Sequence, residues 1–82
     1  MKAWYMYVVK CADNTLYTGV TTDITRRLKE HNSSKKGAKY TRGRRPVILT
    51  YKENFENRSQ ACKAEAAFKK LTRQQKLSHM KN

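Results

Sequence analysis

The sequence has few acidic residues, few cysteines and no long apolar run. Cys11 and Cys62 lie far apart and lack C-x-x-C spacing, so we expect reduced thiols and no disulfide framework. The chain has two histidines as well, and these four possible zinc ligands are scattered along the sequence, so we do not expect a zinc site. No stretch approaches the roughly 18 apolar residues that a membrane span needs. The first residues lack a signal-peptide pattern, so we expect a cytoplasmic protein.

The shortage of acidic residues leaves a large positive charge. Lys and Arg total 19 against 6 Asp and Glu, which gives a formal charge of +13 and a pI of about 10.2. A pI above about 9 is typical of nucleic-acid-binding domains. The alternatives are a solvated basic face, an anionic membrane surface and a solubility feature. We favour nucleic acid as the partner, DNA before RNA, and no membrane, because the basic residues cluster along the chain.

The main cluster of positive charge lies in the polar segment 33–45, which we expect to be a loop. Gly37 and Gly43 make it pliable, and Tyr40 interrupts the charges, which suits a phosphate backbone with an occasional stacked base. The alternative is a disordered, solvated stretch of charge. The residues expected to contact nucleic acid are Lys35, Lys36, Lys39, Tyr40, Arg42, Arg44 and Arg45, with Lys69 and Lys70 further along.

Two strands are predicted near the start of the chain. Residues 4–10 are aromatic and β-branched, and residues 15–20 follow a turn at 12–14, so an antiparallel hairpin should bring Tyr7 beside Tyr17. A glycine late in the second strand, Gly19, indicates a bulge or a close backbone approach, with a simple local kink as the alternative.

The rest of the chain alternates between helix and strand. A helix is expected over 23–31, a third strand over 47–52, a helix over 59–71 capped by Asn57 or Ser59, and a short helix over 72–80 that begins with a capping box. The long helix carries an apolar stripe at Ala61, Ala64, Phe68 and Leu71. The order ββαβαα predicts an α+β fold, and 82 residues leave room for one domain, 1–82.

Phosphodiester hydrolysis needs a base, a fixed positive charge and a metal or an acid. Arg27 offers a permanent charge matched to phosphate, and His31 follows it by one helical turn. Glu65, on the margin of the apolar stripe, is the best single carboxylate for Mg²⁺. Tyrosine is a plausible base only beside a metal or a positive charge.

These residues resemble the GIY-YIG nuclease family over nearly the whole chain. The first motif corresponds to Tyr5-Met6-Tyr7, and the second corresponds to Tyr17-Thr18-Gly19 after an interval of nine residues. Arg27, His31 and Glu65 follow in the family's order. The runs at 16–19, 37–46 and 65–71 are similar to the small stand-alone bacterial members, the YhbQ/YazA-like (UPF0213) group. The resemblance implies a three-stranded antiparallel sheet flanked by helices, which agrees with the order of elements above.

The resemblance also implies roles for the site residues. Tyr7 would be the general base, Tyr17 would position the water or the phosphate, and Arg27 would clamp the scissile phosphate. His31 would assist proton transfer or phosphate binding, and Glu65 would bind one Mg²⁺ or Mn²⁺. The chain would then be an endonuclease that hydrolyses DNA. Independently of the resemblance, we expect a monomer or a weak dimer, a choice that the sequence leaves open.

Two departures from the family pattern favour weak, structure-selective or partner-dependent cleavage. Tyr5 replaces the glycine of the first motif, and glutamine, lysine and leucine occupy 74–77, where larger members carry an asparagine. The alternative function is a non-catalytic nucleic-acid binding module. A third is an adaptor whose basic segment docks on an acidic protein. Structural alternatives for single residues are sheet packing for the tyrosines, a helix-dipole contact for His31 and an ion pair between Glu65 and Lys69.

Overall fold

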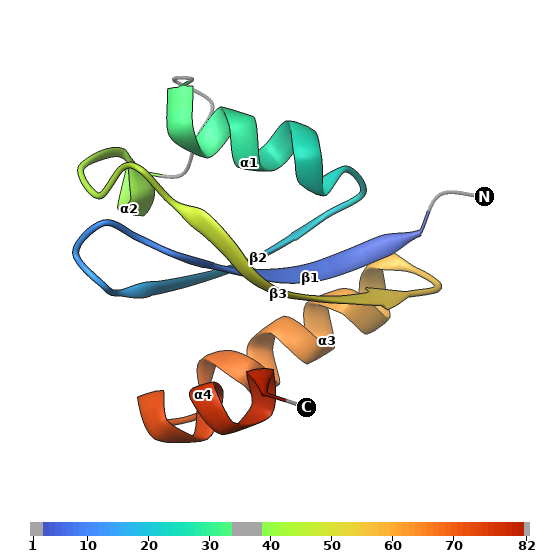
Figure 1. Cartoon of the computed structure of the whole chain (residues 1–82). Helices are drawn as coiled ribbons and strands as arrows, with labels where there is room; N and C mark the ends of the chain where they lie inside the picture. The colour runs from blue at the N-terminus through green and yellow to red at the C-terminus, as the bar shows by residue number, and fades with distance from the viewer. Residues whose placement is uncertain (1–2, 34–38, 82) are drawn as a thin grey trace.

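The fold is a three-stranded antiparallel sheet between two layers of helices. The computed structural model describes residues 3–33 and 39–81. The sheet has the order β2-β1-β3, and α1 and α2 lie on one side of it, with α3 and α4 on the other (Figure 1). The α+β fold expected from the sequence is therefore confirmed. The elements are β1 (Trp4–Lys10), β2 (Leu16–Thr21), α1 (Ile24–Ser33), α2 (Lys39–Arg42), β3 (Ile48–Phe55), α3 (Arg58–Lys69) and α4 (Arg73–Met80).

The central strand β1 builds both cores because its side chains alternate between the two faces. Tyr7 and Val9 belong to a cluster that α1 covers. Met6 and Val8 belong to a second cluster with Phe68 of α3. This double burial explains why β1 reads as a nearly continuous apolar run rather than an alternating one.

The hairpin of β1 and β2 has a regular register, in which Tyr7 pairs with Gly19 and Val9 pairs with Tyr17. Tyr17 is therefore the diagonal neighbour of Tyr7, on the same face of the sheet. A bulge at Gly19, one of the options left open by the sequence, is absent from this pairing.

The third strand is longer than predicted. It was expected over 47–52, with a connection from residue 54, but β3 runs from Ile48 to Phe55. Phe55 pairs with Trp4 and Asn54 pairs with Tyr5, so the start of β1 extends the ladder of β3. Pairing with β1, rather than the local sequence, therefore sets where β3 ends.

The helix ends agree with the predicted caps. Asn57, rather than Ser59, caps α3 by accepting a hydrogen bond from the backbone of Gln60 at 2.9 Å. Thr72 and Gln75 form the capping box of α4. None of the helices in the described residues has the length and apolar character that crossing a bilayer requires.

The segment 33–45 differs from its prediction as a loop. Ser33 is the last residue of α1, and residues 39–42 form the one-turn helix α2. Thr41 is the buried residue of this turn and bonds to α1, so tertiary contacts hold a helix that the local sequence does not favour. Lys35, Lys36, Gly37 and Ser34 lie outside the described residues.

Candidate active site

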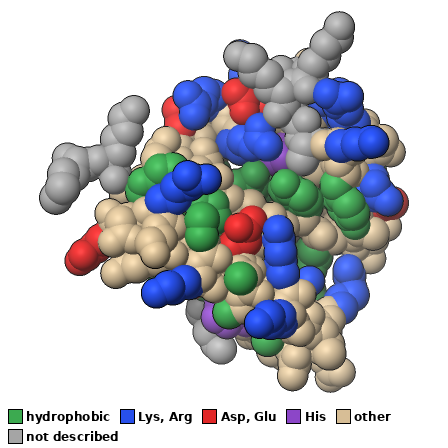
Figure 2. Space-filling view, turned by 180° about the vertical axis from the view of Figure 1, so that it is seen from behind, with side chains coloured by type: hydrophobic (Ala, Val, Ile, Leu, Met, Phe, Trp, Pro, Cys, Tyr) green, Lys and Arg blue, Asp and Glu red, His purple; other side chains and the backbone are tan. Residues whose placement is uncertain are grey.

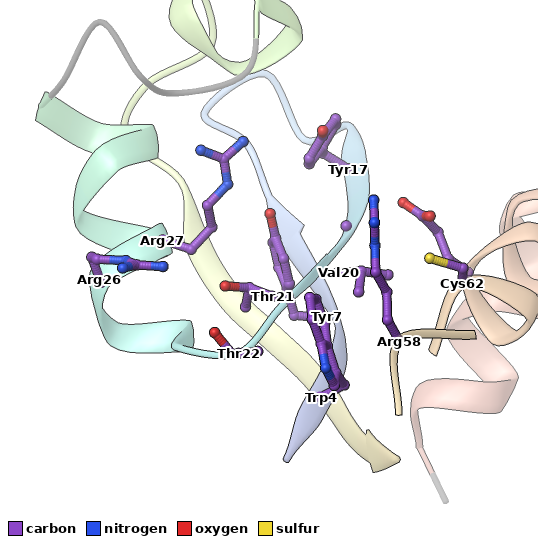
Figure 3. Close-up of a pocket in the computed structure, with 12 residues that line it drawn as sticks. Trp4, Tyr7, Tyr17, Val20, Thr21, Thr22, Arg26, Arg27, Arg58 and Cys62 are labelled. Atoms are coloured by element: carbon purple, nitrogen blue, oxygen red, sulfur yellow. The ribbon is translucent and has the colours of Figure 1, made fainter. Parts of the chain in front are cut away.

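One pocket is lined from β1, β2, α1 and α3 and has a volume of about 480 Å³ (Figure 3). Four of the five residues expected to act in catalysis line it: Tyr7, Tyr17, Arg27 and Glu65. Trp4, Gly19, Val20, Thr21, Thr22, Arg26, Arg58 and Cys62 complete the lining. Residues from four separate elements thus converge on one concave surface.

Tyr7 is almost fully buried at the base of this pocket, with 2% of its surface exposed. Burial raises its pKa to about 12, although a hydrogen bond and the positive charge of Arg27 oppose this rise. The ring passes directly over Gly19, where a Cβ would lie 2.6 Å from the Tyr7 ring carbon Cζ. Gly19 is therefore required by the close approach of the Tyr7 ring to its backbone, one of the options that the sequence left open.

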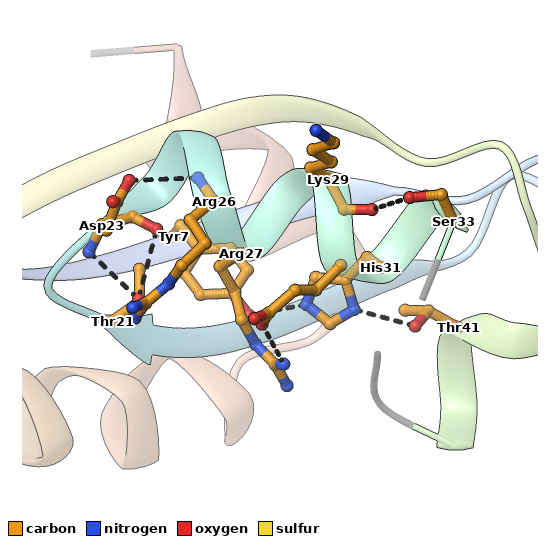
Figure 4. Close-up of polar contacts among 10 residues, drawn as sticks. Tyr7, Thr21, Asp23, Arg26, Arg27, Lys29, His31, Ser33 and Thr41 are labelled. Atoms are coloured by element: carbon orange, nitrogen blue, oxygen red, sulfur yellow. Dashed lines mark hydrogen bonds and ion pairs between the residues drawn. The ribbon is translucent and has the colours of Figure 1, made fainter. Parts of the chain in front are cut away.

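His31 lies behind Tyr7 and is completely buried. Its Nε2 is 2.8 Å from the Tyr7 hydroxyl, and its Nδ1 is 2.8 Å from the Thr41 hydroxyl (Figure 4). Burial, followed by the charge of Arg27, lowers the pKa of His31 to about 4, so the imidazole is neutral at physiological pH. In this arrangement His31 is not a lining residue of the pocket. It contacts the proposed base rather than the space where a phosphate would lie.

Tyr17 is held by rings on either side of it. Its ring packs edge-on against His31, with centroids 5.3 Å apart, and stacks on Tyr40 of α2 at 5.7 Å. The Arg44 guanidinium lies 4.1 Å from the centre of the Tyr40 ring. Such aromatic and cation–π contacts fix the orientation of the half-buried Tyr17, which lines the pocket.

Arg27 points from α1 toward Tyr7 and carries a permanent charge. Although burial lowers its pKa, hydrogen bonds to Glu30 and Tyr7 outweigh that effect and hold the pKa above its ordinary value. The bond from Arg27 Nη1 to Glu30 Oε1 is 3.0 Å long. The guanidinium is therefore oriented before any substrate arrives.

Glu65 belongs to a second stripe of α3. Arg58, Cys62 and Glu65 follow one another at i, i+4 and i+7 and all line the pocket, while the adjacent stripe that includes Ala61 and Phe68 faces the core. The Glu65 carboxylate also lies 3.3 Å from Lys69 Nζ. Helical periodicity at positions 58, 62 and 65 was the signal that would have identified Arg58 as a pocket residue.

Glu65 can supply one carboxylate ligand to a metal ion whose other ligands come from outside the protein. The described residues contain no group of three His, Cys, Asp or Glu side chains that could hold a metal. Mg²⁺ accepts one or two carboxylates when waters and substrate phosphates fill its other positions. The donor set therefore fits an ion that reaches the site with its own waters and the substrate.

Two of the residues expected to bind nucleic acid, Arg44 and Arg45, have partners within the fold. Arg44 donates to Asp13 Oδ2 at 2.9 Å and to the carbonyl of Tyr40 at 2.8 Å. Arg45 donates to the carbonyl of His31. These contacts tie the segment after α2 to the hairpin turn and to α1.

The other candidates are distributed over the surface. Lys39, Arg42 and Lys70 are exposed, Lys69 pairs with Glu65, and Lys35 and Lys36 lie outside the described residues. Figure 2 shows one face on which Lys and Arg side chains greatly outnumber the acidic ones. Arg26 and Arg58, which the sequence did not single out, add positive charge at the pocket itself.

The fold and the pocket define a small α+β domain with tyrosine, arginine and glutamate side chains gathered over a hairpin. The chain belongs to the GIY-YIG family, because the model of the GIY-YIG catalytic domain matches residues 3–78. It is 58% identical to a UPF0213 protein of Streptococcus agalactiae over 94% of this chain and 86% of that protein. A UPF0213 protein of Desulfotalea psychrophila is 61% identical over 85% of this chain, which spans 64% of that relative's length.

Two solved structures have the same fold. The solution structure of a protein from E. faecalis is 57% identical, with a TM-score of 0.69, over 99% of this chain and 85% of that one. The solution structure of a UPF0213 protein from Bacillus halodurans is 42% identical, with a TM-score of 0.62, over 96% and 83% of the two chains. The names of these relatives state no activity, so the family indicates a nuclease without defining its substrate.

Proposed function

We propose that this protein is a metal-dependent endonuclease that hydrolyses phosphodiester bonds in DNA, with weak or structure-selective activity. The observation that carries the proposal is the convergence of Tyr7, Tyr17, Arg27 and Glu65 on one pocket. The excess of positive charge supports a polyanionic partner. A cytoplasmic location and a monomeric or weakly dimeric state are part of the same proposal.

In the proposed reaction, a water oxygen bonds to phosphorus while the bond to the leaving sugar oxygen breaks. The water gives a proton to the Tyr7 oxygen as Tyr7 gives its own proton to His31 Nε2, 2.8 Å away. The leaving oxygen takes a proton from solvent. Arg27 binds the non-bridging oxygens, where negative charge develops, and Tyr17 orients the water or the phosphate.

The resting pocket keeps the proton on Tyr7, because the pKa of Tyr7 is about 12 and that of His31 is about 4. A negatively charged phosphate in the pocket raises the pKa of His31 and brings the two values closer together. Bound at Glu65, Mg²⁺ or Mn²⁺ would stabilise charge on the phosphate and the leaving oxygen and lower the pKa of Tyr7. Cleavage should therefore depend on both substrate and cation.

One contact favours the alternative of a nucleic-acid binding module without catalysis. Lys69 lies 3.3 Å from the carboxylate that would hold the metal, and it competes with a cation for Glu65. The Lys69 side chain is 54% exposed, and ion pairs of this i, i+4 kind are worth only about 0.3–0.5 kcal/mol. A divalent cation with its substrate can displace so weak a partner, so we rank hydrolysis first.

A panel of duplex, single-stranded, flap, branched and RNA substrates, each with Mg²⁺, Mn²⁺ or chelator, tests the proposal. Metal-dependent nicking should fall roughly 100-fold in Arg27→Ala and in Glu65→Ala. Arg73→Ala and Glu56→Ala remove the same charges at exposed positions outside the pocket and should leave nicking unchanged. Nicking that survives both pocket substitutions would come from a contaminant and would refute the proposal. Salt-sensitive binding without cleavage of any substrate would identify the binding module.

A further inference from the structure

The one-turn helix α2 contributes a buried side chain to the back of the pocket. Thr41 has no exposed surface, and its hydroxyl oxygen lies 2.8 Å from His31 Nδ1. His31 is equally buried, and its other ring nitrogen lies 2.8 Å from the Tyr7 hydroxyl. Thr41, His31 and Tyr7 thus form a chain of hydrogen bonds that solvent does not reach from behind.

The direction of these bonds follows from the protons that the groups carry. Tyrosine keeps its hydroxyl proton at neutral pH, and burial strengthens that preference at Tyr7. The guanidinium of Arg27 lies beside the Tyr7 oxygen and is only a donor, so the tyrosine proton needs an acceptor elsewhere. His31 Nε2 lies at the right distance to be that acceptor. A neutral imidazole then carries its one proton on Nδ1 and donates it to Thr41.

We propose that Thr41 is a positioning residue: by accepting the Nδ1 proton of His31, it fixes the imidazole tautomer whose Nε2 accepts from Tyr7. A hydroxyl group can also donate, in which case His31 would carry its proton on Nε2 and give it to Tyr7. That opposite tautomer would leave Nε2 unable to accept the Tyr7 proton. The effect of Thr41 on cleavage rests on the function proposed above, whereas its effect on the tautomer does not.

A second contact from the same turn reaches the other tyrosine of the pocket. Tyr40, next to Thr41, stacks on Tyr17 at 5.7 Å. Both tyrosines of the pocket are therefore supported from α2, one through His31 and one by direct stacking. The helix turn that the sequence did not predict acts as the rear support of the site.

Imidazole ¹⁵N NMR of the metal-free protein tests the proposal directly. The chain has two histidines, so His79, which lies on the other side of the sheet, is an internal reference. Wild-type His31 should carry its proton on Nδ1. Thr41→Val, which keeps the shape and removes the hydroxyl, should shift His31 toward the Nε2 tautomer. Thr41→Ser, which restores a hydroxyl, should restore the wild-type signals.

Two outcomes would overturn the proposal: an Nε2-protonated His31 in the wild type, or an unchanged tautomer in Thr41→Val. The wild-type spectrum is decisive by itself if the valine variant does not fold. In cleavage assays, Thr41→Val should lower kcat roughly 10- to 100-fold with little change in KM, and Thr41→Ser should recover most of it. A tautomer that shifts as expected in a protein that cleaves nothing would refute the endonuclease and retain the role of Thr41.

Discussion

At the scale of single residues, the absence of a side chain at Gly19 leaves the space that the Tyr7 ring occupies. Gly19→Ala would put a methyl group 2.6 Å from Tyr7 Cζ. The buried ring has little room to move, and moving it would break its bond to His31. We expect a loss of about 1–3 kcal/mol in the free energy of unfolding, together with a loss of cleavage.

Denaturant unfolding and nicking assays measure these two losses, and Gly43→Ala is the matched control. A Cβ at position 43 meets nothing within 4 Å, so this variant should behave like the wild type. Equal behaviour of the two alanine variants would contradict the tight fit between Gly19 and Tyr7.

The buried imidazole of His31 should make the fold sensitive to mild acid. Its pKa falls from 6.5 to about 4 on folding, because burial disfavours the charged form. Between these values the unfolded chain binds more protons than the folded chain, so stability is complete above about pH 6.5 and falls as pH decreases toward 4. We expect a lower urea midpoint at pH 5 than at pH 7.

Two asparagine variants assign this acid sensitivity to its source. His31→Asn should be less stable at pH 7 and should show a shallower dependence on pH than the wild type. His79→Asn removes an exposed imidazole and should retain the slope that His31 causes. A wild-type slope in His31→Asn would show that other groups cause the acid sensitivity.

At the scale of elements, α3 serves two purposes with two adjacent stripes. The stripe with Ala61 and Phe68 packs on the sheet, while Arg58 and Glu65 line the pocket. We expect Arg58→Ala to weaken the binding of metal-free protein to DNA and to reduce the slope of log K against log salt by about 1. Arg73→Ala, at the first residue of α4, removes the same charge outside the pocket and should change binding less. Gel-shift titrations at several salt concentrations measure the difference.

The elements also show which features of the fold could be predicted from the sequence. The apolar stripe of α3 and the caps at Asn57 and Thr72 are local patterns, so both helices could be predicted. The turn α2 has no such pattern, because it is held by the contact of Thr41 with His31. Similarly, the ladder to Trp4 sets the end of β3. Order along the chain identified four pocket residues, and helical spacing from Glu65 could have added Arg58. Thr41, by contrast, needed its three-dimensional neighbour His31.

At the scale of the whole molecule, the charge of +13 should act through a limited set of contacts. Arg26, Arg27 and Arg58 at the pocket, with Lys39, Arg42 and Lys70 on the surface, give six candidate phosphate contacts. Six contacts to duplex DNA correspond to a slope of about −5 in log K against log salt. A slope near zero in the same titration would contradict an electrostatic mode of binding.

We expect part of the positive charge, including Arg44, to stabilise the fold rather than to bind nucleic acid. Its bonds to Asp13 and to the carbonyl of Tyr40 connect the hairpin turn with α2. Arg44→Gln should lower the urea midpoint, because it removes the bonds to Asp13 and Tyr40, and should leave the salt slope nearly unchanged. Arg58→Ala should show the reverse pattern, so urea unfolding and gel shifts on the two variants test this division. A reduced slope in Arg44→Gln would instead make Arg44 a contact of the nucleic acid.

Trp4 has a practical consequence for experiments on this site. It is the single tryptophan of the chain, it lines the pocket, and the Arg58 guanidinium lies 5.9 Å from the centre of its ring. Any ligand that enters the pocket or attracts Arg58 changes the surroundings of the indole. The intrinsic fluorescence of the unlabelled protein therefore reports on pocket occupancy, so stopped-flow emission can time substrate entry separately from cleavage.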